Sequence, residues 1–261
     1  MKNTNLVIPM AGHGVRFKDY IDVPKPWIPI SGKPMIVRTA ECLPPTKKQI
    51  FVCRKEHLEK YPIEKMINET YPNSECIGID YTTRGLIFTS ELGVTQSKTK
   101  WNDDDSLFIS CCDNGVVYDK ERYEQLRKND SIDCIIWGVK NNPAVTVVPN
   151  AWEWIRVDAD ENFVDVSIKK QVSDNPYNDY MVVGNFEFKK SSDYLEAMNR
   201  IHKQVGTVTH EFYGGHVVNE YIKMGKNVVM FDADLYVSWG VPDQIRLFEA
   251  WEKYFKEFQS K

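Results

Sequence analysis

The apolar run Leu6-Val7-Ile8-Pro9-Met10-Ala11 leads straight into the glycine loop Gly12-His13-Gly14-Val15-Arg16-Phe17. A short apolar run that stops at glycine predicts a buried strand followed by a tight turn. Glycines let backbone N–H groups approach an anion closely. Eight residues beyond Arg16, Pro24-Lys25-Pro26 fixes the backbone on both sides of a lysine. We therefore interpret the segment as a phosphate-binding strand and loop, with Arg16 and Lys25 as the two cations that neutralise the phosphate.

The loop is neither of the two common phosphate-binding fingerprints. No Gly-Lys-Ser/Thr follows it, which excludes a Walker loop, and Phe17 stands where a dinucleotide fingerprint has its third glycine. A lone pair of glycines also occurs in plain strand–helix turns, and a lysine between prolines is often only a solvated loop residue. The order of the parts, rather than any one of them, carries the phosphate hypothesis.

Composition narrows the class of protein. The 261 residues are 42% hydrophobic and 27% charged, with a net charge of −4 and a pI of about 5.8, so no basic surface predicts nucleic-acid binding. No apolar run has membrane length, and the first residues lack a signal-peptide core, so we expect a cytoplasmic protein without membrane partners. Six cysteines without a C-x-x-C pair are typical of reduced core thiols. We expect a monomer or a homodimer.

Strand-like and helix-like segments alternate in the first half of the chain, which predicts a parallel sheet with helices on both faces. The middle, residues 130 to 190, has more strands and predicts an antiparallel or mixed extension. The predicted strands are Asn5–Pro9, Gln49–Cys53, Ser106–Cys111, Ile132–Val139, Ala144–Val148, Trp154–Asp158, Phe163–Ile168, Tyr180–Phe188 and Asn227–Phe231. The predicted helices are Pro34–Cys42, Pro62–Glu69, Phe88–Ser97, Lys120–Lys128, Ser192–Gln204, Gly215–Met224 and Pro242–Lys256. In the last helix, Ile245, Phe248, Trp251, Tyr254 and Phe255 form a stripe that we expect to face the core.

Three elements in order resemble the N-terminal signature of the nucleotidyltransferases. They are the strand with G-x-G-x-R-F, then P-K-P, then Ile30-Ser31-Gly32-Lys33-Pro34-Met35-Ile36. The family includes sugar-1-phosphate nucleotidyltransferases and cytidylyltransferases, and the chain is most similar to its bacterial capsule and lipopolysaccharide-locus branch. The resemblance implies one Rossmann-like (GT-A-like) α/β domain, 1–261, with a mixed, mostly parallel sheet. It also implies an NTP-binding half, 1–130, an acceptor-binding half, 131–261, and transfer from NTP to a phosphorylated acceptor with release of pyrophosphate.

The resemblance assigns residues to the donor half. Arg16 and Lys25 are the expected catalytic cations. The expected nucleotide-binding residues are Met10, Ala11, Gly12, His13, Gly14, Thr83, Gly85 and Asp113, with Thr83 and Gly85 in Thr82-Thr83-Arg84-Gly85 near the base. Asp113 ends the strand-like run from Leu107, and the resemblance makes it the Mg²⁺ ligand, since Mg²⁺ takes carboxylate and phosphate oxygens. Asp232 or Asp234 is the expected second ligand; we favour Asp234.

The resemblance assigns residues to the acceptor half less directly, because the family pattern is incomplete there. Relatives commonly have Glu-Lys where this chain has Ile168-Lys169-Lys170, so the glutamate is missing and two lysines compete for one place. Strand alternation turns only one of them inward, and we favour Lys169. Gly184, Asn185 and Glu211 are the further expected acceptor residues, although a strand bulge and a helix start would equally explain these segments.

The acceptor and the base stay open. A sugar-1-phosphate is the family default, a non-sugar phosphate such as phosphoglutamine is compatible, and CTP is the expected donor by similarity to capsule-modifying cytidylyltransferases. Two other classes compete. Asp232-Ala233-Asp234 fits the Asp-x-Asp motif of metal-dependent glycosyltransferases, and the departures from the family pattern would also suit an inactive nucleotide-binding regulator.

Overall fold

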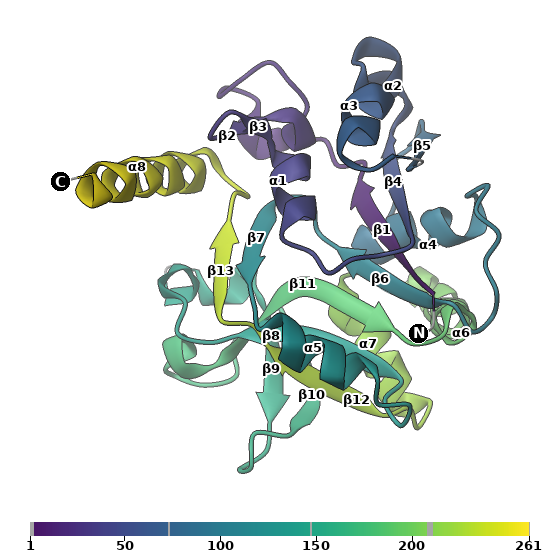
Figure 1. The fold of residues 1–261 in the computed structure, drawn as a ribbon. Helices are drawn as coiled ribbons and strands as arrows, with labels where there is room; N and C mark the ends of the chain where they lie inside the picture. Colours follow the sequence, from purple (N-terminus) through teal and green to yellow (C-terminus); the bar gives the residue numbers. More distant parts are fainter. Residues whose placement is uncertain (1–2, 73, 147, 208–210, 261) are drawn as a thin grey trace.

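The computed structural model of the protein describes residues 3–72, 74–146, 148–207 and 211–260. Within them nine strands form one sheet in the order β10-β9-β11-β6-β1-β4-β5, with β8 pairing with β11 and β12 (Figure 1). These strands are β1 (Thr4–Met10), β4 (Lys48–Arg54), β5 (Glu75–Ile79), β6 (Ser106–Ser110), β8 (Cys134–Val139), β9 (Glu153–Val157), β10 (Phe163–Ile168), β11 (Tyr180–Phe188) and β12 (Val228–Asp232). Two small ribbons pair β2 (Pro29–Ile30) with β3 (Lys33–Pro34), and β7 (Asn114–Val117) with β13 (Leu235–Ser238).

Strand directions differ between the two halves of the chain. β1 pairs in parallel with β4 and β6, and β4 with β5. β11 runs antiparallel to β6, β8 and β9, and β9 is antiparallel to β10, whereas β12 is parallel to β8. The predicted α/β fold, with a mixed sheet and an antiparallel extension in the middle of the chain, is therefore confirmed.

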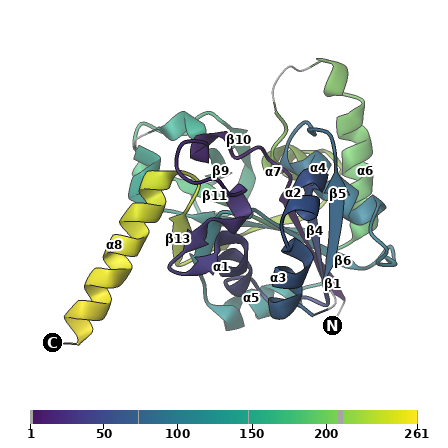
Figure 2. The ribbon, with the colours of Figure 1, turned by 90° about the horizontal axis from the view of Figure 1, so that it is seen from above.

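Helices cover both faces of the sheet, as predicted (Figures 1 and 2). They are α1 (Met35–Glu41), α2 (Lys55–Lys60), α3 (Ile63–Thr70), α4 (Leu86–Thr95), α5 (Lys120–Arg127), α6 (Ser191–His202), α7 (Gly214–Lys223) and α8 (Pro242–Gln259). Val7 of β1 packs in a core with residues of α4, α6 and α7, while its neighbours Leu6 and Ile8 pack in a second core with residues of α1, α3 and α5. This alternation follows from the period of two in a strand, and it explains why β1 is apolar almost throughout.

One predicted strand, Ala144–Val148, is wrong. Pro143–Thr146 and Pro149–Ala151 form short 3₁₀ turns instead, and residue 147 lies outside the described part of the chain. Proline fixes φ and lacks an N–H, so a proline on each side favours turns over a ladder. The remaining predicted strands and helices are found within three residues of their predicted bounds, while β2, β3, β5, β7, β13 and α2 are additions.

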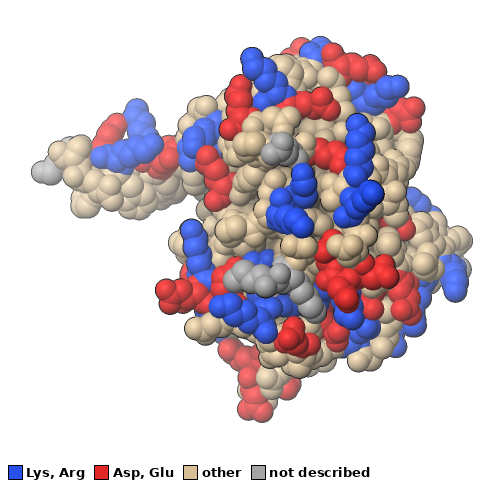
Figure 3. Space-filling view, turned by 45° about the vertical axis from the view of Figure 1, so that its right-hand side comes forward, with Lys and Arg blue, Asp and Glu red and all other residues tan. Residues whose placement is uncertain are grey.

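The packing expected for the last helix is also wrong. Ile245 is buried and Phe248 contacts Trp239, but Trp251, Tyr254 and Phe255 are all exposed. Figures 1 and 3 show the reason, because α8 projects away from the body of the protein. The spacing correctly predicts a helix, but no part of the described chain covers most of its apolar stripe.

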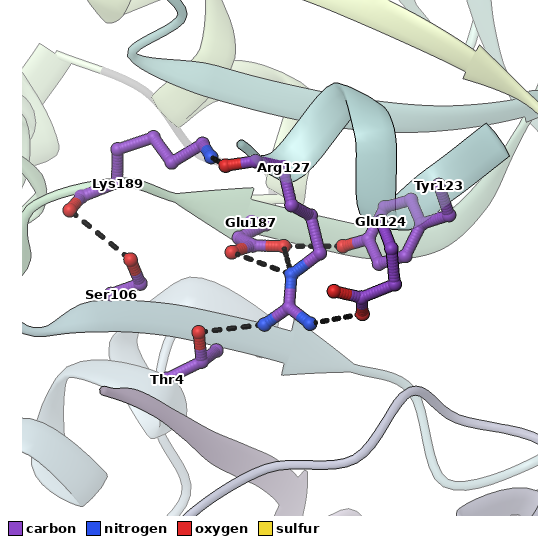
Figure 4. A network of polar contacts seen from close by, with 7 residues as sticks. All are labelled: Thr4, Ser106, Tyr123, Glu124, Arg127, Glu187 and Lys189. Atoms are coloured by element: carbon purple, nitrogen blue, oxygen red, sulfur yellow. Dashed lines mark hydrogen bonds and ion pairs between the residues drawn. The ribbon is translucent and has the colours of Figure 1, made fainter. Parts of the chain in front are cut away.

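A buried polar network ties the amino ends of β1 and β6 to β11 and α5 (Figure 4). Glu187 is almost fully buried, receives a hydrogen bond from Tyr123, and pairs with the Arg127 guanidinium at 2.9 Å. Arg127 also donates to Thr4 Oγ1 at 2.7 Å and pairs with Glu124 at 2.6 Å. The charges of Glu124, Arg127 and Glu187 are therefore paired with one another, at the end of the sheet opposite the site described next.

Within the described ranges, no helix is both long and apolar enough to cross a lipid bilayer. All six cysteines are free thiols.

Candidate active site

A cavity of about 380 Å³ opens at the carboxyl ends of β1 and β6. The chain runs from β1 to β4 and β5 on one side and returns to β6 on the other side of β1. Such a reversal of strand order leaves a crevice where α/β sheets bind ligands. The lining residues are Pro9, Met10, Ala11, Gly12, Gly14, Val15, Arg16, Phe17, Lys25, Pro26, Thr82, Thr83, Gly85, Leu86, Thr89, Cys111, Cys112, Asp113, Glu211 and Gly240.

The glycine loop forms one wall of this cavity. Gly14 has φ +63°, and a Cβ there would lie 3.1 Å from the Lys25 Cβ, so the turn and the lysine segment pack closely. The backbone N–H groups of residues 12–14 donate to no acceptor in the described residues, and no carboxylate there pairs with Arg16. His13 lies at the edge, with its Nε2 2.9 Å from Thr82 Oγ1. Free amides beside a free guanidinium suit an anionic ligand.

Gly12→Ala is expected to raise the KM for NTP about tenfold or more without lowering the melting temperature. A Cβ at Gly12 would meet nothing within 4 Å in the free protein, so folding should tolerate it, but it would obstruct a phosphate that approaches the loop backbone. The matched control is Gly206→Ala, which is equally unobstructed and lies outside the cavity lining. An unchanged KM in Gly12→Ala would place the phosphates elsewhere.

Lys25 and Asp113 meet inside the cavity, although 88 positions separate them in the chain. Lys25 Nζ lies 2.5 Å from Asp113 Oδ2 and 5.9 Å from the centre of the Phe17 ring. Burial by itself would lower the pKa of Lys25, but Asp113 together with Cys112 and Cys111 outweighs it, so the pKa is raised and the amine stays charged. The neighbouring thiols are poor nucleophiles, since burial raises the pKa of Cys112 to about 12.

Asp113 fits a divalent cation, but Asp234 does not join it. Asp113 Oδ1 has no hydrogen-bond donor among the described residues, so one carboxylate oxygen is available to a hard cation that also takes phosphate oxygens. Asp113 precedes Asn114, whose partner in the β7–β13 ribbon is Ser238, the last residue of β13. Asp234 precedes Leu235, the first residue of β13, so it lies at the other end of the ribbon, 3.7 Å from Arg122. The described residues contain no group of three or more His, Cys, Asp and Glu that could bind a metal unaided.

The segment expected near the base is built from tight backbone contacts. Gly85 has φ +125°, and a Cβ there would lie 2.2 Å from the Phe212 carbonyl oxygen, so only glycine fits. Thr83 Oγ1 lies 2.6 Å from Thr89 Oγ1 and donates to the Gly85 carbonyl at 3.2 Å. Arg84 points out of the site and donates to the Val205 carbonyl at 2.7 Å. Thr83 and Gly85 therefore line the cavity, while Arg84 does not.

Lys169 is half-buried and Lys170 is exposed, and neither residue lines the cavity. Lys169 has φ +55°, so the chain leaves strand geometry there and turns its ammonium toward the Ala151 carbonyl and the face of Tyr213, 4.6 Å away. Burial lowers the pKa of Lys169, and the negative charges of Glu153 and Glu211 offset this only in part. The geometry thus turns Lys169 rather than Lys170 toward these carboxylates.

The other expected acceptor residues have different surroundings. Gly184 has φ +94°, and a Cβ there would lie 2.6 Å from Cys111 Sγ, which agrees with a bulge in β11. Asn185 is fully buried and accepts from Ser110 at 2.8 Å, so it lies beneath the cavity rather than in it. Glu211 lines the cavity and accepts from Tyr213 at 3.2 Å; His210, from the same sequence segment, lies outside the described residues.

Glu153 is a residue that sequence reasoning missed. It is the cross-strand partner of Ile168, so β9 supplies a carboxylate beside the position where β10 has none. Its Oε1 accepts from the Gly215 N–H at 2.9 Å, and burial raises its pKa to about 7 against the opposing effects of that bond and of Lys169. No single-sequence signal links positions 153 and 168, because the pairing of β9 with β10 depends on the fold.

No family model and no curated protein matches the sequence. Solved structures match instead over almost the whole chain. A nucleoside-diphosphate-sugar pyrophosphorylase from Vibrio cholerae RC9 matches with a TM-score of 0.73 and 19% identity, covering 93% of this chain and 98% of that one. The inositol-1-phosphate CTP transferase from T. maritima gives 0.70 and 16%, with 95% of each chain covered. HddC from Yersinia pseudotuberculosis gives 0.62 and 19%, with 97% and 100% covered.

This chain has the fold of the sugar-phosphate nucleotidyltransferases. At these identities the likeness concerns the fold alone, and the reaction has to be argued from the site.

Proposed function

We propose that this protein is a nucleotidyltransferase that joins an NTP to a phosphorylated small molecule and releases pyrophosphate. The observation that carries the proposal is the Lys25–Asp113 pair, which lies 2.5 Å apart in a cavity walled by loop amides and by Arg16, none of which has a partner among the described residues. A cation next to a carboxylate, both facing anion-binding amides, can hold a triphosphate together with a divalent ion. Residues 1–130 would form the donor half and residues 131–261 the acceptor half of one domain.

The reaction we propose is an in-line displacement. A phosphate oxygen of the acceptor attacks the α-phosphorus of the NTP, the bond between the α-phosphorus and the bridging oxygen breaks, and pyrophosphate leaves with the electron pair. Arg16 and the loop amides hold the β- and γ-phosphates, and Lys25 offsets the charge that builds up on the α-phosphate. Positioning and charge stabilisation supply most of the catalysis in such reactions.

Asp113 would hold Mg²⁺ through its free Oδ1. When bound, the ion supplies charge neutralisation on the phosphate oxygens. Because Asp234 lies at the other end of β13, phosphate oxygens and water would complete its coordination rather than a second aspartate.

The acceptor side pairs one cation with carboxylates. Lys169 would bind the acceptor phosphate, while Glu153 and Glu211 would accept hydrogen bonds from hydroxyl or amino groups of its organic part. Glu153 accepts only one hydrogen bond in the described structure, although a carboxylate has sites for about four. The acceptor class is thus a phosphate whose carbon skeleton carries hydrogen-bond donors, as a sugar-1-phosphate or phosphoglutamine does.

Glu153→Gln is expected to raise the KM for the acceptor about tenfold while leaving the KM for NTP within twofold. In the wild type, the pKa of about 7 means that Glu153 gains its charge as pH rises through 7, so the acceptor KM should fall across that interval. The variant cannot ionise at this position and should lose that part of the pH dependence. The exposed Glu161→Gln is the matched control. Equal effects on both KM values would assign Glu153 to general stability.

A panel of the four NTPs against phosphorylated sugars, alcohols and amino acids, read by pyrophosphate release, tests the proposal and identifies the substrates. We expect CTP to be the preferred donor, and the presence of the T. maritima CTP transferase among the similar folds supports this expectation. We also propose a role in capsular or surface polysaccharide synthesis. NTP binding without turnover would favour the inactive regulator. Sugar transfer from a nucleotide sugar would favour a glycosyltransferase, although Asp232 and Asp234 both lie outside the cavity lining.

A further inference from the structure

The projecting helix α8 carries an apolar seam that the body of the protein does not cover. Its 18 residues span about 27 Å. Its apolar contacts with the described body come from Ile245 and from Phe248 against Trp239, and Glu249 and Glu252 add polar contacts with the Ser31 N–H and Arg38. Leu247, Trp251, Tyr254 and Phe258 follow at spacings of four, three and four, and their exposed fractions are 60%, 52%, 52% and 65%. This is the a/d spacing of a two-helix coiled coil.

The seam differs from the rest of the surface. Exposed large apolar side chains elsewhere in the described residues occur at most once per helix or strand, whereas α8 has five, including Phe255 stacked on Trp251. Polar residues lie away from the seam, where Lys253 pairs with Glu257 and Lys256 with Glu252. Figure 3 shows the charged atoms of the projection gathered along its upper edge, with uncharged atoms below.

We propose that α8 packs antiparallel against α8 of a second copy of this chain. The seam is symmetric about the midpoint between residues 252 and 253, so a two-fold axis there brings Leu247 against Phe258 of the second copy and Trp251 against Tyr254 of the second copy. A two-fold interface has to be self-complementary in this way. Because the body of the protein lies at the amino end of α8 (Figure 1), the antiparallel orientation places the two bodies at opposite ends of the helix pair.

Charge favours the same orientation. On the amino side of the proposed axis, residues 246–252 have Glu249 and Glu252 against Arg246. On the carboxyl side, residues 253–259 have Lys253 and Lys256 against Glu257. Antiparallel pairing sets each acidic half beside a basic half, and it also opposes the two helix dipoles favourably. Parallel pairing would set like halves together.

The area of the seam matches a modest but specific dimer. Aromatic side chains bury about 150–250 Å² each when covered, so half-exposed ones leave roughly 100 Å² apiece. The four exposed aromatic side chains of α8 together with Leu247 give about 500 Å² per copy and about 1,000 Å² for the pair, before the flanking residues are counted. Specific interfaces bury about 1,200–2,000 Å² in total, so a second α8 and its flanks are enough to cover the seam.

Sedimentation of the full chain at micromolar concentration tests the proposal. We expect the wild type to have twice the chain mass of 30.3 kDa, and Trp251→Glu or Phe258→Glu to raise the dimer Kd about 30-fold or more. The matched control is Gln259→Glu, which adds the same charge one residue away, off the seam, and should remain a dimer. Far-UV circular dichroism checks that each variant keeps its helix content.

Three results would overturn the proposal. They are a monomeric wild type, a dimer that both seam substitutions leave intact, and a dimer that Gln259→Glu disrupts as strongly as Phe258→Glu. None of them bears on the reaction, because the seam residues lie outside the cavity lining.

Discussion

Lys25→Gln is expected to lower kcat for pyrophosphate release by about 10²–10³-fold. Glutamine keeps most of the length of the side chain but removes the positive charge that Lys25 is proposed to place next to the α-phosphate. Loss of one such stabilising group costs about 3–4 kcal/mol in the transition state. The substitution also leaves Asp113 without its partner at 2.5 Å. Steady-state kinetics with the preferred NTP and acceptor would measure kcat and both KM values.

The matched control for this substitution is Lys18→Gln. Lys18 directly follows the glycine loop, is exposed, and does not line the cavity. The kcat of Lys18→Gln should therefore stay within twofold of the wild type. A Lys25→Gln enzyme with near-normal kcat would contradict the assigned role, whatever its effect on KM.

Glu187→Ala is expected to lower the free energy of unfolding by about 3–5 kcal/mol. It removes the buried acceptor shared by Tyr123 and Arg127 and leaves the Arg127 charge partly buried without that partner (Figure 4). The kinetic constants of the folded variant should change little, because Thr4 and Arg127 lie at the edge of the sheet away from the cavity. Urea unfolding, followed by tryptophan fluorescence, would measure the change in midpoint.

Glu196→Ala is the control for Glu187→Ala. Glu196 pairs with Arg200 at 3.0 Å on the exposed face of α6, and surface pairs of this kind contribute at most about 1 kcal/mol. If both substitutions shifted the midpoint equally, the network of Glu187 would have no special part in stability.

The glycine-loop wall of the cavity could be predicted from sequence because its information is local. An apolar strand, two glycines and a lysine held by prolines specify the wall of the cavity within 30 residues. The surroundings of Lys169 could not be predicted as well. Glu153 lies beside Ile168 only because β9 pairs with β10, and Lys169 approaches Tyr213 because its positive φ ends the strand alternation on which a choice between two lysines would rest.

The other differences have equally specific causes. Asp234 and Asp113 are separated because β13 runs antiparallel to β7, a pairing between segments more than 100 residues apart. In α8 the helical period identifies an apolar stripe, but a period carries no information on which surface covers it. Whether the stripe faces the core or solvent depends on the path of the chain after Gly240, which carries the helix away from the body (Figure 2).

The central claim is that the cavity at Lys25 and Asp113 transfers a nucleotidyl group to a phosphate. Phosphorus NMR of a reaction with NTP, Mg²⁺ and the acceptor found in the panel tests it most directly. The account predicts that NTP is lost as pyrophosphate and a new diphosphate-linked product appear in equal amounts, and that Lys25→Gln slows both equally. Release of orthophosphate, or consumption of NTP without a diphosphate-linked product, would contradict it.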